Sequence, residues 1–182
     1  MKTLAHHILD IVENSINANA ARIEISVEEQ PANDRYVIAI KDNGAGIDPE
    51  SLKQITDAYY TTRTTRAVGL GLALLRQNAE MTGGYVEIDS ELQKGTVVRA
   101  IFGYSHLDKQ PLGDISGTIT MLMAANSAHE FRYTHITPEG TYVADSVEIK
   151  EALGNMPLGQ VAIQRYIREM IEENLREIKM KS

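Results

Sequence analysis

The sequence predicts an α+β fold, a two-layer α/β sandwich in which a mixed sheet is covered by helices on one face, with a small C-terminal α+β region. Residues 3–20 carry apolar side chains at three- and four-residue steps, the period of an amphipathic helix. Two strand-like segments follow, and the order helix, strand, strand then repeats. This mixture favours helices gathered on one side of a sheet.

Turn and cap signals bound the elements expected in the first hundred residues. A turn at 31–34 separates the first two strands, Asp48 begins a short helical stretch, and Gly83 and Gly84 end the second long helix. The polar, threonine-rich segment 59–68 has no period and is expected to be a loop. In chain order we expect a helix at 3–20, strands at 22–27 and 36–40, helices from 48 and at 69–81, and strands at 85–89 and 96–102.

The pattern loosens at residues 103–113, which we interpret as a boundary between a first domain at 1–103 and a regulatory or partner-binding region at 104–182. The second region is expected to hold a helix at 114–126, a hairpin of strands at 131–136 and 141–147, and a helix at about 160–179. The last helix has an apolar stripe formed by Val161, Ile163, Ile167, Ile171 and Leu175. Such a stripe favours packing onto its own domain, and a homodimer seam is the alternative.

Composition argues against several classes of function. A formal net charge of −7 provides no basic field, so we do not expect a nucleic-acid partner. The chain has no cysteine, which excludes disulfides, thiolate zinc sites and iron–sulfur ligation by its own residues. No apolar run approaches the ~20 residues that span a bilayer, and the N-terminus lacks the pattern of a secretion signal. We expect a cytoplasmic protein with no membrane association.

Asp10 and Asn14 are four residues apart on the first expected helix and therefore project from one face. A carboxylate and an amide oxygen so placed could share a hard cation, since magnesium prefers oxygen ligands and keeps several waters. A solvated helix face is the alternative interpretation. The pair alone does not decide between them.

Asp42 stands at the end of an expected strand, within the run Lys41-Asp42-Asn43-Gly44-Ala45-Gly46-Ile47. Two nearby glycines permit a tight turn and the close approach of a ligand to the backbone. A buried carboxylate needs a donor, and the exocyclic amine of a purine could supply one. A plain hairpin turn is the alternative.

A glycine-rich segment, Gly69-Leu70-Gly71-Leu72, begins the second long helix. Helix N-termini expose unpaired N–H groups, and glycines let phosphate oxygens reach them. The preceding segment contains Thr61, Thr62 and Arg63, which could donate to phosphates as part of a lid. Gly95-Thr96, within the last strand pair, is a weaker signal.

The four segments 10–14, 42–46, 69–71 and 95–96 resemble, in order and spacing, the N, G1, G2 and G3 boxes of the GHKL ATPases. That superfamily includes DNA gyrase, the heat-shock chaperone ATPases, histidine kinases and the mismatch-repair ATPases. The stretch YYTTRTTRAVGLGLALL looks most like the lid and G2 box of histidine kinases. The resemblance covers residues 3–103 and implies the Bergerat ATP-binding fold, with ATP and Mg²⁺ as ligands.

The resemblance also implies roles for individual residues. Asn14 matches the magnesium-binding asparagine, with Asp10 beside it, and Asp42 matches the aspartate that binds the adenine amine. The other candidate nucleotide-binding residues are Gly44, Gly46 and Ile47 at the adenine pocket, Thr61, Thr62 and Arg63 in the lid, Gly69, Leu70, Gly71 and Leu72 beside the phosphates, and Thr96 near adenine.

Asp10 departs from the family pattern. The hydrolysing branches carry a glutamate there as general base, and histidine kinases commonly carry an asparagine. An aspartate can accept a proton but has one methylene less, so hydrolysis is permitted and not assured. Glu13 lies about a hundred degrees round the helix and is the second, less favoured base candidate.

Two histidine motifs offer rival interpretations that we do not favour. His6 and His7 are adjacent on a helix, so their side chains point in different directions, which disfavours a metal site. The segment from Ser127 to Arg132 faintly resembles the phosphoacceptor box of histidine kinases, but it follows the ATP domain instead of preceding it. Autophosphorylation at His129 is therefore not expected.

Three classes of function remain. The chain could be a protein kinase acting in trans on a separate partner, an ATPase, or a nucleotide-gated protein-binding module. We favour a signalling or regulatory kinase or ATPase that acts on a separate partner, because the usual dimerisation hairpin of histidine kinases is not evident. The chain also resembles short stand-alone proteins of the superfamily that are associated with iron-only hydrogenase systems.

Overall fold

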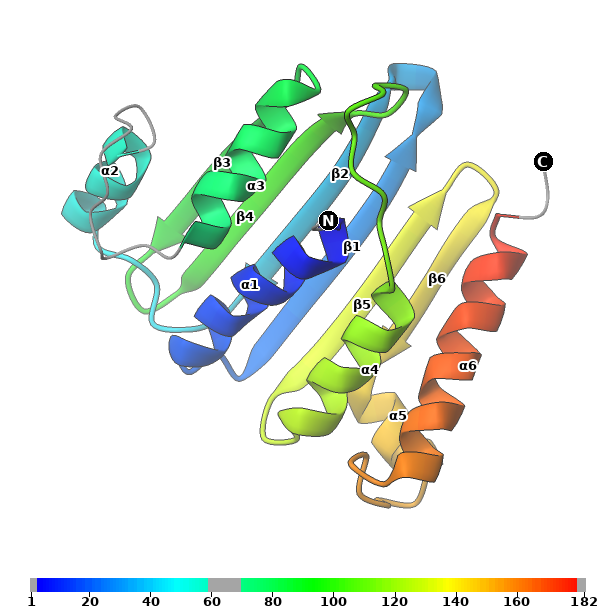
Figure 1. Ribbon diagram of the computed structural model, residues 1–182. Helices are drawn as coiled ribbons and strands as arrows, with labels where there is room; N and C mark the ends of the chain where they lie inside the picture. Colours follow the sequence, from blue (N-terminus) through cyan, green and yellow to red (C-terminus); the bar gives the residue numbers. More distant parts are fainter. Residues whose placement is uncertain (1–2, 59–69, 180–182) are drawn as a thin grey trace.

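The computed structural model describes residues 3–58 and 70–179, which form a six-stranded mixed sheet in the order β3-β4-β2-β1-β5-β6 (Figure 1). The pairing of β1 with β5 is parallel, and the other four pairings are antiparallel. The elements are α1 (Leu4–Asn17), β1 (Arg22–Gln30), a 3-10 turn (Pro31–Asn33), β2 (Arg35–Asp42), α2 (Pro49–Ala58), α3 (Leu70–Met81), β3 (Tyr85–Glu91), β4 (Gly95–Gly103), α4 (Ile115–Ala125), β5 (Glu130–Thr137), β6 (Gly140–Asp145), α5 (Ser146–Ala152) and α6 (Val161–Glu177).

Helices α1, α3, α4 and α6 lie on one face of the sheet (Figure 1). Alternation along the strands explains this layering, because β1 turns Ile23, Ile25 and Val27 into the core while its intervening residues are partly exposed. Strand β5 does the same with Phe131 and Tyr133. The expected two-layer sandwich with helices on one face of a mixed sheet is confirmed.

Helix α1 lies across the middle of the sheet, and its start is held by the connection between β4 and α4. The N–H groups of Leu4 and Ala5 donate to the carbonyl oxygens of Pro111 (3.0 Å) and Leu112 (2.8 Å). These bonds satisfy two of the N–H groups that a helix start leaves without an internal partner. The connection therefore fixes the position of the helix that carries Asp10 and Asn14.

The C-terminal hairpin extends the same sheet. Residues 22–28 of β1 pair in parallel with residues 130–136 of β5, and one buried apolar cluster runs through both parts of the chain. The expected boundary near residue 103 coincides with the end of β4. The sheet is continuous across the two regions expected from the sequence.

Helix α6 packs within the chain. Its stripe is buried at Ile163, Ile167, Ile171 and Leu175, all of which belong to the main apolar cluster, whereas Val161 is 77% exposed. The favoured interpretation of this stripe is confirmed for the four buried positions.

Several element boundaries differ from expectation by a few residues; β1, for example, continues to Gln30 instead of ending at 27. The last strand ends at Asp145 instead of continuing to 147, because the Asp145 carboxylate accepts a hydrogen bond from the N–H of Val147 (2.9 Å) and so caps the unexpected helix α5. Helix α1 ends at Asn17, and Asn19 then adopts a left-handed conformation with φ of 55°. Within residues 3–58 and 70–179, no helix is long and apolar enough to cross a membrane.

Candidate functional site

Asp42 lies at the end of β2 with its carboxylate buried beneath α1. Its Oδ1 accepts the backbone N–H groups of Gly44 (2.9 Å) and Thr96 (3.3 Å), and its Oδ2 accepts the hydroxyl of Ser15 (2.6 Å). The side chain faces the helix layer because Ile38 and Ile40 precede it on the buried face of β2. A carboxylate offers about four acceptor positions, so about one remains for an external donor.

The glycines after Asp42 let the loop pass close to neighbouring backbone. A Cβ on Gly44 would lie 2.8 Å from the carbonyl oxygen of Ala18, and the next N–H, of Ala45, donates to that same oxygen (2.9 Å). Gly46 has φ of +69° and packs against the backbone of Glu91. A side chain at either position would push the loop away from its supports.

The hairpin of β3 and β4 holds the other side of this loop. The N–H of Gln93 donates to the carbonyl of Ala45 (2.7 Å), and the N–H of Ile47 donates to the hydroxyl of Ser90 (2.8 Å). Ser90 pairs across the strands with Thr96, and their hydroxyl oxygens lie 2.8 Å apart. The structure thus brings Asp42, Gly44, Gly46, Ile47 and Thr96 into one cluster.

Sequence reasoning did not single out Ser15 and Ser90, which support Asp42 and Thr96. A signal was present for Ser15, which is a polar residue on the buried stripe of α1 in line with Ile8 and Ile11. Ser90 likewise occupies a helix-facing position in β3, where Val86 and Ile88 precede it. A polar residue that interrupts an apolar stripe is the signal that could have identified both serines.

The second part of the candidate site lies where α3 meets α1. A Cβ on Gly71 would lie 2.8 Å from the Cβ of Asp10 and 3.2 Å from its Oδ2. The first turn of α3 therefore contacts the α1 face that carries Asp10, and Leu72 is buried in the core beneath it. Asn14 and Glu13 are exposed one turn further along.

A cation at this place would have Asp10 and Asn14 as protein ligands. Within the described residues no group of three or more His, Cys, Asp or Glu side chains could hold a metal ion. One carboxylate and one amide oxygen are ligands of the kind that Mg²⁺ prefers, and Mg²⁺ commonly keeps waters and binds substrate phosphates as well.

Some candidates fall outside the described part of the chain. These are Thr61, Thr62, Arg63 and Gly69. Leu70 is the first residue of α3, so the backbone at the start of that helix belongs to the described part of the chain. The Leu70 side chain does not.

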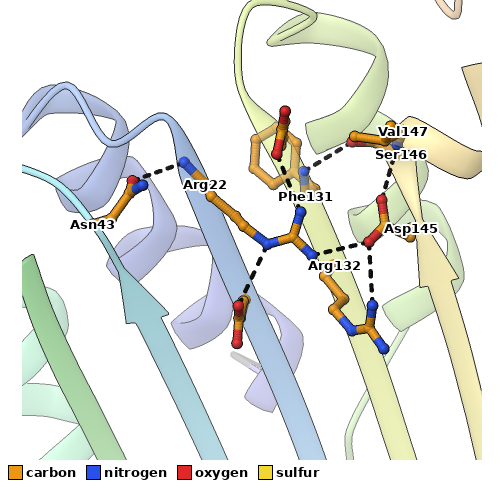
Figure 2. A network of polar contacts seen from close by, with 9 residues as sticks. Arg22, Asn43, Phe131, Arg132, Asp145, Ser146 and Val147 are labelled. Carbon is orange, nitrogen blue, oxygen red and sulfur yellow. Dashed lines mark hydrogen bonds and ion pairs between the residues drawn. The ribbon is translucent and has the colours of Figure 1, made fainter.

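Arg22 links residues 43–47 after Asp42, which we call the pocket loop, to the C-terminal hairpin (Figure 2). Its N–H donates to Oδ1 of Asn43 (2.8 Å), the residue after Asp42. Its guanidinium reaches Glu130 (3.1 Å) and the buried Asp145 (3.1 Å), which Arg132 also contacts (3.4 Å). Arg22 therefore connects the end of β2, through its backbone N–H, to the cap of α5, through its guanidinium.

The histidines have structural partners. His6 Nδ1 accepts the N–H of Thr3 (3.2 Å), and buried His7 contacts the Asn78 amide nitrogen through Nε2 (2.8 Å). Nδ1 of His129 lies 2.6 Å from the carbonyl oxygen of Ala20. A carbonyl can only accept, so His129 carries a proton on Nδ1 and joins the β5 turn to the end of α1.

A model of the histidine kinase-, DNA gyrase B-, and HSP90-like ATPase family matches residues 2–105, which is more than half of the chain. The match includes every candidate site residue in the described part of the chain.

Curated relatives match over a similar stretch. A putative sensor protein of Shewanella frigidimarina is 35% identical over 103 residues, which is 56% of this chain and 16% of that protein. Sensor histidine kinase ZraS of Salmonella typhimurium is 36% identical over 95 residues, which is 52% of this chain and 20% of that protein. The chain thus spans a fifth or less of the length of these relatives.

Among solved structures, the N-terminal domain of a DNA repair protein has the same fold, with a TM-score of 0.52 and 21% sequence identity. The likeness covers 79% of this chain and 52% of that chain. This share exceeds the part that the family model matches, so the shared fold extends past residue 105 into the C-terminal region.

Proposed function

The chain belongs to the histidine kinase-, DNA gyrase B-, and HSP90-like ATPase family, which implies ATP binding, and we propose that it binds ATP with Mg²⁺ to act on a separate protein partner. The favoured activity is that of a signalling or regulatory kinase or ATPase. The observation that carries the proposal is the buried Asp42 carboxylate, which accepts three protein donors and keeps about one acceptor position for a ligand.

Adenine fits the acceptor character of this pocket. Its exocyclic amine would donate to Asp42, with Thr96 beside the same carboxylate. The Asp42 carboxylate is an acceptor, so a base that presents a carbonyl oxygen at that position would meet repulsion between two acceptors. The loop glycines Gly44 and Gly46 keep the backbone close to where the base would lie.

The phosphates are assigned to the junction of α1 and α3. The start of α3 provides N–H groups and the positive end of the helix dipole, and Gly71 has no side chain to block them. Asp10 and Asn14 would hold Mg²⁺, which when bound supplies charge neutralisation for the phosphate oxygens. Thr61, Thr62, Arg63 and Gly69 are proposed lid and phosphate contacts.

Asp10 is the first candidate for general base, because it lies beside the start of α3 where the terminal phosphate would be. Glu13 is the second candidate and is exposed on the next turn of α1. Either residue would accept a proton from water in an ATPase, or from the hydroxyl or imidazole of a partner in a kinase.

A nucleotide-gated protein-binding module is the second candidate function. The Arg22 contacts favour it, since they connect the pocket loop through Asn43 to Asp145 at the start of α5. Nucleotide binding that moved this loop would be transmitted to the C-terminal region, where a protein partner could bind.

Incubation of the full chain with γ-labelled ATP and Mg²⁺, alone and with cell extract, tests these alternatives. Label on an extract protein would support a kinase, and free phosphate that Asp10→Asn abolishes would support an ATPase. ATP binding without either product would favour the gated binding module. Absence of ATP binding by calorimetry would refute the proposed function.

A further inference from the structure

The hydroxyl of Ser90 lies where three segments around the candidate pocket meet. It accepts the N–H of Ile47 (2.8 Å), lies 3.0 Å from the carbonyl oxygen of Gly95, and lies 2.8 Å from Oγ1 of Thr96. Ser90 holds this position because it pairs directly with Thr96 across β3 and β4. Thr96 in turn pairs with Asp42 across β4 and β2. The three side chains therefore form a row across the sheet.

Counting protons shows that this arrangement has two forms. A serine hydroxyl carries one proton, so Ser90 can donate to Gly95 or to Thr96 but not to both. When Ser90 donates to Gly95, the short contact with Thr96 requires Thr96 to donate its own proton to Ser90. Thr96 then offers a ligand lone pairs alone. When Ser90 donates to Thr96, the Thr96 proton is free to point at a ligand.

We propose that Ser90 is a positioning residue that sets the hydrogen-bond polarity of Thr96 toward the nucleotide base. The proposal rests on the proposed function, in which Asp42 accepts the exocyclic amine of adenine. The N–H of Thr96 donates to Oδ1 of Asp42 (3.3 Å), so a base held by Asp42 would place its amine edge near the Thr96 hydroxyl.

The ring nitrogen bonded to the carbon that carries the amine of adenine is N1, which is an acceptor. Thr96 must therefore act as a donor toward it, directly or through one water, and Ser90 must turn its proton from Gly95 to Thr96. The result is a chain of hydrogen bonds from Ser90 to Thr96 to N1, in which each bond polarises the next. No covalent bond changes, because the two hydroxyl groups only rotate.

The test is titration calorimetry of the full chain with ATP and with 1-deaza-ATP, in which a C–H replaces N1 and the amine is kept. The wild-type protein is expected to prefer ATP by about fivefold, the effect of roughly one net hydrogen bond. Ser90→Ala is expected to lower this preference by weakening ATP binding, because Thr96 loses the donor that fixes its hydroxyl toward N1, and Ser90→Thr is expected to restore it. Ser26→Ala, on β1 away from the pocket, is the matched control and should keep the wild-type preference.

An equal loss of affinity for both nucleotides in Ser90→Ala would overturn the proposal, because a merely structural role predicts that result. Unchanged affinity for both would overturn it as well. If Ser90→Ala fails to fold, Ser90→Cys replaces it, since a thiol is a weak donor of similar size; a Ser90→Cys preference equal to wild type would contradict the proposal. A wild-type protein that binds neither nucleotide would refute the proposed function itself.

Discussion

Oε1 of Glu29 lies 2.8 Å from Nε2 of His135 and so joins β1 to β5 at the end of the sheet far from Asp42. His135 is fully buried, and its Nδ1 lies 2.7 Å from the hydroxyl of Tyr133. The Lys179 ammonium lies 3.3 Å from the same Glu29 oxygen. The hydrogen bond with His135 and the charge of Lys179 lower the pKa of Glu29 against the opposing effect of burial.

The lowered pKa of Glu29 predicts that stability depends on acid pH. A carboxyl whose pKa is lower in the folded state stabilises the fold fully above its unfolded value, near 4.5. That contribution is lost as pH falls through the folded pKa. We expect the unfolding free energy to fall across this range, and to fall less in Glu29→Gln. Urea unfolding of both proteins at stepwise lower pH measures this loss of stability. Identical pH profiles for the wild type and Glu29→Gln would contradict the contribution assigned to Glu29.

Asp42→Asn is expected to weaken ATP binding at least about tenfold while leaving the fold intact, because an amide can place a donor against the adenine amine. The new amide can still contact Ser15, so the melting temperature should change little. Calorimetry with ATP measures the affinity. Unchanged affinity would remove Asp42 from the adenine pocket.

Ser15→Ala tests whether the Ser15 hydroxyl holds the Asp42 carboxylate in place. Removing the 2.6 Å bond leaves Oδ2 of Asp42 without its serine donor, and we expect ATP affinity to fall about two- to tenfold. Ser51→Ala, on α2, serves as the control for a serine-to-alanine change elsewhere. A loss of the same size in both variants would argue against a role for Ser15 in the pocket.

Gly46→Ala and Gly83→Ala form a matched pair for the pocket loop. Both glycines have positive φ, of 69° and 76°, so alanine costs each about 1–2 kcal/mol of backbone strain. A Cβ at Gly46 would also strike the backbone of Glu91, whereas none of the described atoms lies within 4 Å of one at Gly83. Chemical unfolding should show the larger loss for Gly46→Ala. Equal losses would mean that the loop relaxes away from the β3–β4 hairpin without cost.

Asp145→Ala should destabilise the fold by about 2–4 kcal/mol, since it removes a helix cap and leaves Arg22 and Arg132 without a buried partner. Asp114, which caps α4 but is 55% exposed, is the control, and Asp114→Ala should cost about 1 kcal/mol. Thermal unfolding compares the two. A cost for Asp145→Ala no larger than that of the control would show that the Arg22 contacts contribute little.

Local patterns predicted most of the fold. The apolar stripes of α1 and α6 and the alternation in β1 and β2 are properties of contiguous residues, so their periods indicate the elements directly. The parallel pairing of β1 with β5 has no such signature, because it depends on which distant strand reaches the free side of β1. Helix α5 was missed since a single cap, Asp145, outweighs the strand-like character of Val147.

The candidate site was predicted in part. Asp42, Gly44 and Gly46 come from one short motif, and the structure brings them together with Thr96 as the expected order of segments requires. Ser15 and Ser90 were not predicted, because a serine gains its role from the partner that packing brings to it. The resemblance to the GHKL ATPases is confirmed by the family match over residues 2–105.

The parallel pairing of β1 with β5 also governs when the protein can fold during synthesis. Arg22 and Glu130, which face each other in this pairing, are 108 positions apart, so a long loop must close before the bond between them forms. Until β5 leaves the ribosome, the edge of β1 that later pairs with β5 has unpaired N–H and C=O groups, with which another chain could pair. Completion of the sheet therefore waits for the C-terminal hairpin, even though most of the proposed ATP site is made earlier.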